Sequence, residues 1–192
     1  MSKFSNYILL YIFLFFGLNI YSQSPPGLED FTNSNANTSY ANNSFVGNSS
    51  IIWTYVKTRN ANNDANSSGI SLPALMLQKS SVGSKVTSSI ISGGIGDFSV
   101  KLYKGFTGAG SRQVELFVNG VSKGTSTPFD DFSEHIFSVT GINVSSDIII
   151  EIVNITSKQI IIDDISWTGY SPPTTTVPDD NFEAYLETHT AA

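Results

Sequence analysis

Short runs of alternating apolar and polar residues, separated by turn residues, fill the chain from about residue 28 to residue 170. In residues 97–103 the side chains of Phe98, Val100 and Leu102 fall on one face, which is the period of a half-buried strand. Further strands are predicted at 51–57, 85–92, 113–118, 121–123, 132–139, 147–153 and 159–167, whereas 74–78 fits either a strand or a brief helical turn. The pattern predicts eight to ten strands in an all-β, antiparallel β-sandwich or barrel.

One tight turn is indicated by the dipeptide Asn119-Gly120, which separates two strand-like runs. Both residue types tolerate a positive φ, as the type I′ hairpin turn requires. The pattern therefore predicts a hairpin between 113–118 and 121–123.

The first 22 residues have the form of a secretory signal peptide. Lys3 provides a positive charge, residues 7–20 are apolar and uncharged, and Ser22 is a small residue at the end of the segment. The apolar run is shorter than the roughly 20 residues that a membrane span needs. We therefore expect cleavage after Ser22 and a protein that is secreted or held at the cell surface, with no membrane segment after cleavage.

A change of composition after residue 170 marks the end of the sandwich domain, 28–170. Residues 171–176 (SPPTTT) form a Pro/Thr linker. Beyond it, Asp179 and Asp180 can cap a short helix in which Phe182, Tyr185 and Leu186 share one face. Ten helical residues cannot bury that face alone, so 177–192 is interpreted as the truncated start of a second module.

Composition excludes several kinds of function. The 192 residues include no cysteine, which leaves no disulfide, thiol nucleophile, cysteine-ligated zinc or iron–sulfur cluster. The net charge of −6 argues against nucleic-acid binding, which needs a basic surface. Export without cysteine favours a bacterial secreted protein.

Three stretches together carry a family resemblance: 92–98 (SGGIGDF), 114–120 (VELFVNG) and 161–167 (IIDDISW). They resemble the jelly-roll accessory domain of secreted multidomain proteins from type IX-secreting Gram-negative bacteria, over residues 28–170. The resemblance implies a sandwich of jelly-roll type that accompanies varied partner domains, among them secreted nucleases. Residues 177–186 (VPDDNFEAYL) resemble the start of a leucine-rich-repeat-like surface module.

Two adjacent acids, Asp163 and Asp164, interrupt an otherwise apolar strand. Neighbouring side chains on a strand point to opposite faces, so we expect the two not to serve one site. A buried carboxylate needs a partner or a cation. The general likeness to jelly-roll carbohydrate-binding modules implies a structural Ca²⁺ between the first and last strands, with Glu29, Asp30 and Asp163 as candidate oxygen ligands. Turn capping or pairing with lysine is the alternative for these acids.

Aromatic and amide-rich positions suggest where a sugar could bind, because sugar CH faces stack on aromatic rings. The candidate ligand-binding residues are Tyr55, Arg59, Tyr103, Phe106 and Arg112, with segment 60–66 nearby. Trp53 and Trp167 are interpreted instead as core or rim packing.

An enzyme is not indicated. Asp130, Asp131, Glu134 and His135 cluster in sequence, but a single histidine in an acidic segment is more often a surface residue, and the Gly-x-Ser-x-Gly and His-Glu-x-x-His motifs are absent. We therefore predict a secreted, non-catalytic binding or accessory domain for polysaccharide or another extracellular polymer. The alternatives are a structural spacer of a surface protein, and the accessory part of a secreted hydrolase or nuclease.

Overall fold

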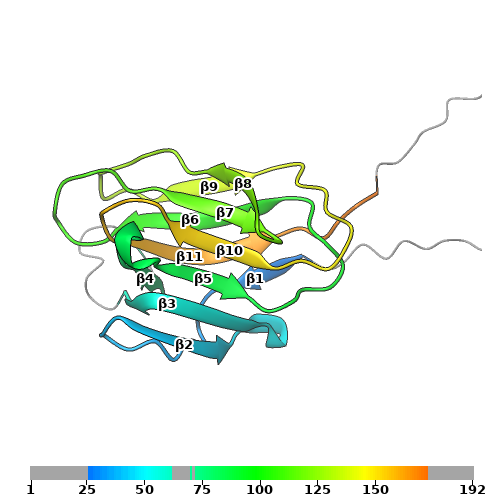
Figure 1. Ribbon diagram of the computed structural model, residues 1–192, viewed down its shortest axis with the longest axis horizontal. Helices are drawn as coiled ribbons and strands as arrows, with labels where there is room; N and C mark the ends of the chain where they lie inside the picture. Colours follow the sequence, from blue (N-terminus) through cyan, green and yellow to red (C-terminus); the bar gives the residue numbers. More distant parts are fainter. Residues whose placement is uncertain (1–25, 62–69, 71, 173–192) are drawn as a thin grey trace, which may run out of the picture.

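The computed structural model describes residues 26–61, 70 and 72–172 (Figure 1). The predicted signal peptide, most of the linker and the predicted C-terminal helix lie outside the described residues. Among the described residues, no helix is long and apolar enough to cross a membrane.

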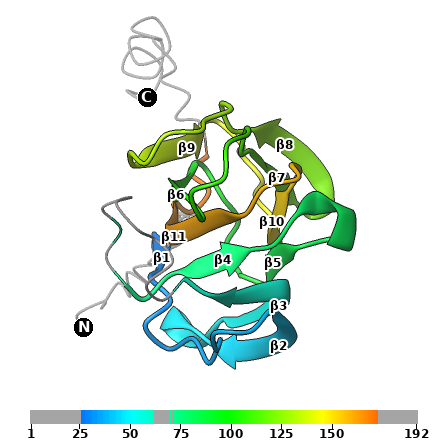
Figure 2. The ribbon, with the colours of Figure 1, turned by 90° about the vertical axis from the view of Figure 1, so that its left-hand side faces the viewer.

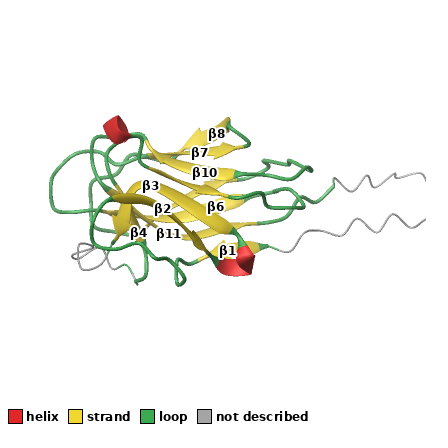
Figure 3. Ribbon diagram, turned by 60° about the horizontal axis from the view of Figure 1, so that its bottom comes forward, coloured by secondary structure: helices red, strands yellow, loops and turns green. Residues whose placement is uncertain are grey.

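Within the described residues the chain forms eleven strands and two short 3₁₀ turns, η1 (Asn48–Ser50) and η2 (Ser80–Val82) (Figure 3). The strands are β1 (Gly27–Glu29), β2 (Ala41–Val46), β3 (Ile52–Asn60), β4 (Leu75–Leu77), β5 (Lys85–Ser88), β6 (Phe98–Lys104), β7 (Val114–Val118), β8 (Val121–Thr125), β9 (His135–Val139), β10 (Ile150–Asn154) and β11 (Ile160–Trp167). Every pairing between them is antiparallel.

Two layers arise because β3 belongs to both. Its first part pairs with β5 in the layer β8-β7-β10-β5-β3, and its last part pairs with β4 in the layer β3-β4-β11-β6-β9. Lys57, between the two parts, has a left-handed backbone (φ 47°), and the chain changes layer there. β2 lines the outer edge of β3, and β1 lies beside the end of β11 (Figure 2).

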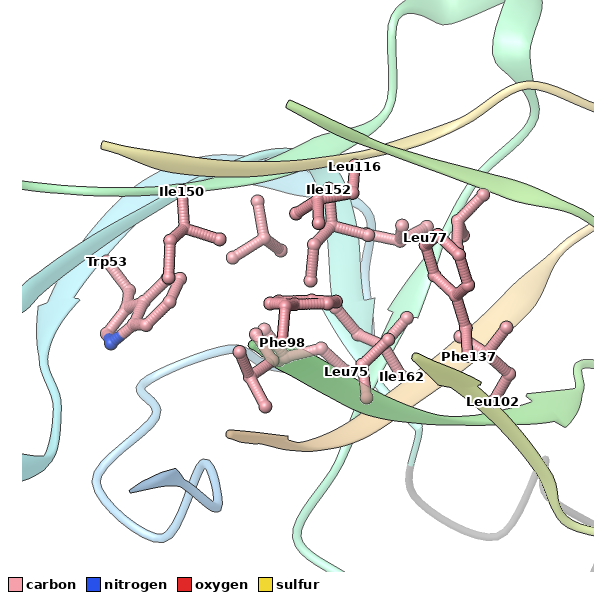
Figure 4. Packing of buried hydrophobic residues seen from close by; sticks show 14 of the residues in the cluster. Trp53, Leu75, Leu77, Phe98, Leu102, Leu116, Phe137, Ile150, Ile152 and Ile162 are labelled. Carbon is pink, nitrogen blue, oxygen red and sulfur yellow. The ribbon is translucent and has the colours of Figure 1, made fainter. Parts of the chain in front are cut away.

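The main core lies between the layers and is filled by alternate residues of the strands (Figure 4). Phe98, Val100 and Leu102 of β6 are buried there, as their spacing predicted. Trp53 and Trp167 are also buried, with ring centroids 6.4 Å apart, which confirms their interpretation as core residues.

Most predicted strands are present, and the ambiguous segment at 74–78 contains the strand β4. β2 was not predicted, because its sequence ANNSFV has a single buried side chain, Phe45, among exposed or half-buried residues that do not alternate. An edge strand of this kind is specified by its ladder with β3 rather than by its own pattern.

The predicted hairpin is confirmed. Asn119 (φ 52°) and Gly120 (φ 74°) link β7 to β8 with both central residues in the left-handed region. The Asn119 side chain accepts from the Ile149 backbone N–H at 2.7 Å and donates to the Asp147 carbonyl at 3.1 Å. The turn is thereby tied to the start of β10.

Candidate functional site

A β-bulge in β11 brings Asp163 and Asp164 to one site. Asp163 is opposite Lys101 and Ser166 is opposite Ser99, so β11 has one extra residue between these pairs. Asp164 adopts a left-handed conformation (φ 46°), which aspartate tolerates better than most residues. The expectation that these neighbours serve different sites was therefore wrong, because alternation of side chains holds only in a regular strand.

Both acids line a pocket of about 300 Å³ on the outer face of the β4-β11-β6-β9 layer, here called the β6–β11 pocket. β6 and β11 form its floor, and the segments after β1, before β4 and before β9 surround it. It is lined by Asp30, Thr32, Leu72, Pro73, Lys101, Tyr103, Glu134, Asp163 and Asp164.

One lysine holds two of the acids in the pocket. Lys101 Nζ lies 2.8 Å from Asp164 Oδ2 and 3.7 Å from Glu134 Oε2. The hydrogen bond to Asp164 raises the pKa of Lys101, so Lys101 is positively charged at neutral pH. The Tyr103 hydroxyl donates to Glu134 Oε2, and burial together with this carboxylate raises the pKa of Tyr103.

Asp163 is the least compensated group in the pocket. It is 6% exposed, and its Oδ1 accepts the Asp164 backbone N–H at 2.8 Å. Among the described residues, its Oδ2 has neither a hydrogen bond nor an ion pair. Burial, with the nearby charge of Asp164 adding to it, raises the pKa of Asp163 to about 7.

The predicted calcium ligands separate into two places. Asp30 and Asp163 line the same pocket, whereas the buried Glu29 is not among the residues that line it. The Glu29 carboxylate accepts the backbone N–H groups of Phe31 (2.8 Å) and Asn48 (2.9 Å), and so joins β1 to η1. Burial raises the pKa of Glu29.

Asp30 is held by its own turn. Its Oδ1 accepts the Thr32 backbone N–H and the Asn48 side-chain amide, each at 3.1 Å, and the Thr32 bond lowers the pKa of Asp30. In the part of the chain that the structure describes, no three acidic or histidine residues are grouped closely enough to hold a metal ion. The calcium site stays a prediction.

Beside the pocket lies a group of three residues, Tyr40, Arg59 and Phe106, here called the aromatic–arginine stack. The Arg59 guanidinium lies over both rings, 5.3 Å from the Tyr40 centroid and 5.2 Å from that of Phe106. Such distances give a cation–π attraction. The structure thus brings together two predicted ligand-binding residues, Arg59 and Phe106, and adds Tyr40.

The stack and the pocket share Tyr103. Both rings of the stack remain partly exposed and pack against a small apolar cluster on the outer face of the layer. That cluster consists of Ala61, Ala74, Met76, Tyr103 and Ile161. Since Tyr103 also lines the pocket, an apolar aromatic surface adjoins a polar cavity.

Tyr103 is only 2% exposed although it lines the pocket, and the other two predicted ligand-binding residues are buried away from the pocket. Tyr55 is 2% exposed, and its hydroxyl donates to Asn35 Oδ1 at 3.1 Å. Arg112 is 1% exposed and fixes the glycine-rich connection after β6. Its guanidinium donates to the carbonyls of Gly105, Gly108, Gly110 and Gln159 and to the carboxylate of Asp130. Segment 60–66 is described only at Asn60 and Ala61.

The acidic residues near His135 have separate partners. Asp130 pairs with Lys104 and Arg112, and Asp131 lies 2.9 Å from His135 Nε2. Glu134 turns instead toward the β6–β11 pocket. The three carboxylates therefore do not converge on the histidine.

Sequence reasoning missed Tyr40, Lys101, Glu134 and Asp164 as members of the site. Lys101 carried a usable signal, because it alternates with the buried residues of β6 and must face outward. Tyr40 and Glu134 lie in irregular segments whose direction the pattern does not specify.

No family model matches the sequence, and no curated protein matches it. Among solved structures, the chain is similar to the CBM36-1 domain of a multidomain xylanase from the hindgut metagenome of Trinervitermes trinervoides (TM-score 0.47, 15% identity, 76% of this chain and 98% of that chain). It is also similar to a family 6 carbohydrate-binding module (TM-score 0.43, 12% identity, 74% and 93%). The catalytic domain of a GH87 alpha-1,3-glucanase matches as well, with the chain covering 30% of it (TM-score 0.47, 13% identity, 82% of this chain). These likenesses concern the β-sandwich fold alone.

Proposed function

We propose that the sandwich is a non-catalytic glycan-binding domain whose ligand lies across the aromatic–arginine stack and the β6–β11 pocket. The observation that carries the proposal is their junction at Tyr103, which places partly exposed rings next to a cavity of fixed polar groups. Rings offer flat apolar surface for the CH faces of a sugar. The carboxylates, Lys101 and the backbone offer acceptors and a donor for its hydroxyls.

The size of the cavity supports a shallow mode of binding. About 300 Å³ is at the lower end of the roughly 300–1,000 Å³ typical of small-molecule pockets, so the pocket suits one sugar ring of a longer chain. The exposed Leu72 and neighbouring Pro73 give the cavity an apolar wall. Adsorption of this kind raises the local concentration of whatever accompanies the domain.

The same proposal includes the location of the protein and the modules that accompany the domain. The signal-like segment 1–22 and the Pro/Thr linker at 171–176 support a secreted or cell-surface protein in which a jelly-roll domain accompanies further modules. The resemblance to accessory domains of type IX-secreted proteins supports this arrangement. A spacer without a ligand is the competing hypothesis.

Substituting one ring of the stack tests the binding site. Phe106→Leu keeps an apolar side chain at the position but removes the flat ring, and it should weaken binding to retained polysaccharides about tenfold, the loss of about 1.4 kcal/mol. Affinity electrophoresis and pull-down on insoluble polysaccharides measure this effect, and thermal melting checks the fold.

Phe117→Leu is the matched control, because Phe117 is a partly exposed ring of β7 in the opposite layer. It should bind like the unchanged protein. If the unchanged protein binds no polysaccharide in a broad panel, the spacer hypothesis is favoured. If both variants lose binding equally, the site lies elsewhere.

A further inference from the structure

The β6–β11 pocket contains more negative than positive charge. Asp30, Glu134, Asp163 and Asp164 line it together with a single cation, Lys101. Lys101 forms its ion pairs with Asp164 and Glu134, so Asp30 and Asp163 have no ion pair among the described residues, although the charge of Lys101 still acts on Asp163. An anionic sugar such as a uronic acid would be repelled from this position.

One acceptor in the pocket has no donor. Asp163 is more than nine-tenths buried, yet its Oδ2 has no partner among the described residues, and the residue lines the cavity. Asp163 is also close enough to Asp30 for that charge to raise its pKa further. A carboxylate in a mostly buried side chain is costly to ionise, and a cationic donor bound in the cavity would relieve that cost.

An ammonium group fits these conditions. It has three N–H donors and a single charge, and hydrogen bonds in which donor and acceptor are both ionised are the stronger kind. A Ca²⁺ ion takes six to eight oxygen ligands, and here it would have to lie near the fixed charge of Lys101. The nearby aromatic–arginine stack offers surface for a sugar ring attached to the ammonium.

We propose that the β6–β11 pocket binds the ammonium group of an amino sugar, so that the preferred ligands are polysaccharides with free amines; this rests on the proposed glycan-binding function. Asp163 accepts a hydrogen bond from the ammonium, and the rest of the sugar extends toward the stack. N-Acetylation of the amine removes the charge and the preference.

Matched oligosaccharides test this inference. Binding of glucosamine oligomers, their N-acetylated counterparts and oligogalacturonate is measured by calorimetry at neutral pH, because in acid the Asp163 carboxylate, with its pKa of about 7, would be protonated. EDTA is present, and two salt concentrations are compared. The glucosamine oligomer should bind about tenfold more tightly than the acetylated one, and oligogalacturonate should bind most weakly.

Two substitutions in the pocket should act in opposite directions. Asp163→Asn should bring the ratio between the amine and acetyl forms close to one, whereas Lys101→Met should increase it by leaving more negative charge. Asp131→Asn, which removes an equal charge from an exposed residue outside the pocket, should leave the ratio unchanged. This control separates the pocket from general attraction between an acidic protein and a basic oligomer.

Each other outcome has a definite meaning. If the glucosamine oligomer and its N-acetylated counterpart bind with equal affinity, and Asp163→Asn does not change the ratio of the two affinities, the amine preference is overturned. The proposed glycan-binding function is not affected by that result. Absence of binding to any oligosaccharide overturns the glycan-binding function itself. The proposal is also overturned if a lysine-containing peptide binds more tightly than the glucosamine oligomer. It is likewise overturned if, without EDTA, Ca²⁺ displaces the glucosamine oligomer from the pocket.

Discussion

At the scale of single residues, the acids of this protein differ because their surroundings differ. Asp130 accepts the Gly110 backbone N–H and pairs with Lys104, and these contacts lower its pKa to about 2. Asp163 has one backbone donor and is buried, and its pKa rises to about 7. The same side chain is thus charged at neutral pH at one position and partly protonated at the other.

The raised pKa of Asp163 makes a prediction about stability. Between the ordinary value of 3.8 and about 7, the folded state binds the proton more tightly than the unfolded state, so stability falls as pH rises through this window. Asp163→Asn removes the buried charge and should stabilise the protein by roughly 1–3 kcal/mol above neutral pH, with little change in acid. Urea unfolding across the pH range measures this difference.

Asp131→Asn serves as the comparison, because a hydrogen bond with His135 lowers the pKa of the exposed Asp131. That variant should gain no stability above neutral pH. A pH profile of Asp163→Asn parallel to that of the unchanged protein would contradict the assignment of the titration to Asp163.

At the scale of elements, the bulge in β11 decides both the packing and the site. Ile160 and Ile162 face the main core before the bulge, and Ile165 and Trp167 face it afterwards. The extra residue shifts the alternation by one position. Both ends of β11 can therefore be buried while Asp163 and Asp164 remain on the outer face.

The left-handed backbone at Asp164 can be tested separately from its charge. Asp164→Asn keeps a residue that tolerates positive φ and should cost little stability, whereas Asp164→Val should destabilise by about 1–2 kcal/mol beyond it. Denaturant unfolding of the two variants gives the difference.

The Asp164→Asn and Asp164→Val variants should also differ in the shape of the β6–β11 pocket. Asp164→Asn should keep the β6–β11 pocket in shape while losing the Lys101 pair. If the valine and asparagine variants were equally stable, the bulge would not depend on the left-handed conformation.

At the scale of the whole molecule, the sandwich separates stability from recognition. The main core lies between the layers, and the aromatic–arginine stack and the pocket lie on the outer face of one layer. Substitutions in the outer surface can therefore change binding without opening the core. Arg112 is the exception, because stability and recognition are linked there. Its buried guanidinium holds the connection after β6 on which Phe106 lies.

A structural calcium ion remains predicted from Glu29, Asp30 and Asp163, and it would act on the whole fold. A ligand that binds only the folded state raises the melting temperature with its concentration. If calcium binds, EDTA should lower the melting temperature by several degrees and excess Ca²⁺ should restore it. Mg²⁺ added in place of Ca²⁺ is the parallel control. An unchanged melting temperature in EDTA would contradict the prediction.

Local pattern was sufficient for most strands and for the hairpin. Phe98, Val100 and Leu102 are buried because their two-residue spacing matches the strand, whatever the strand packs against. Asn119-Gly120 turns the chain because of its own backbone preferences. Arg59 and Phe106 could be proposed from residue type, since guanidinium groups and rings tend to associate.

Long-range contacts decided the rest. Arg112 is the same residue type as Arg59, and Tyr55 the same as Tyr40, and only the packing of distant segments buries Arg112 and Tyr55. The pocket brings Asp30, Glu134 and Asp163 together from three parts of the chain. The sequence by itself determined most of the strands and which of their faces are apolar, because those depend on neighbouring residues. The tertiary structure decided the bulge, the changed pKa of Asp163 and the shared site, because each depends on contacts between residues far apart along the chain.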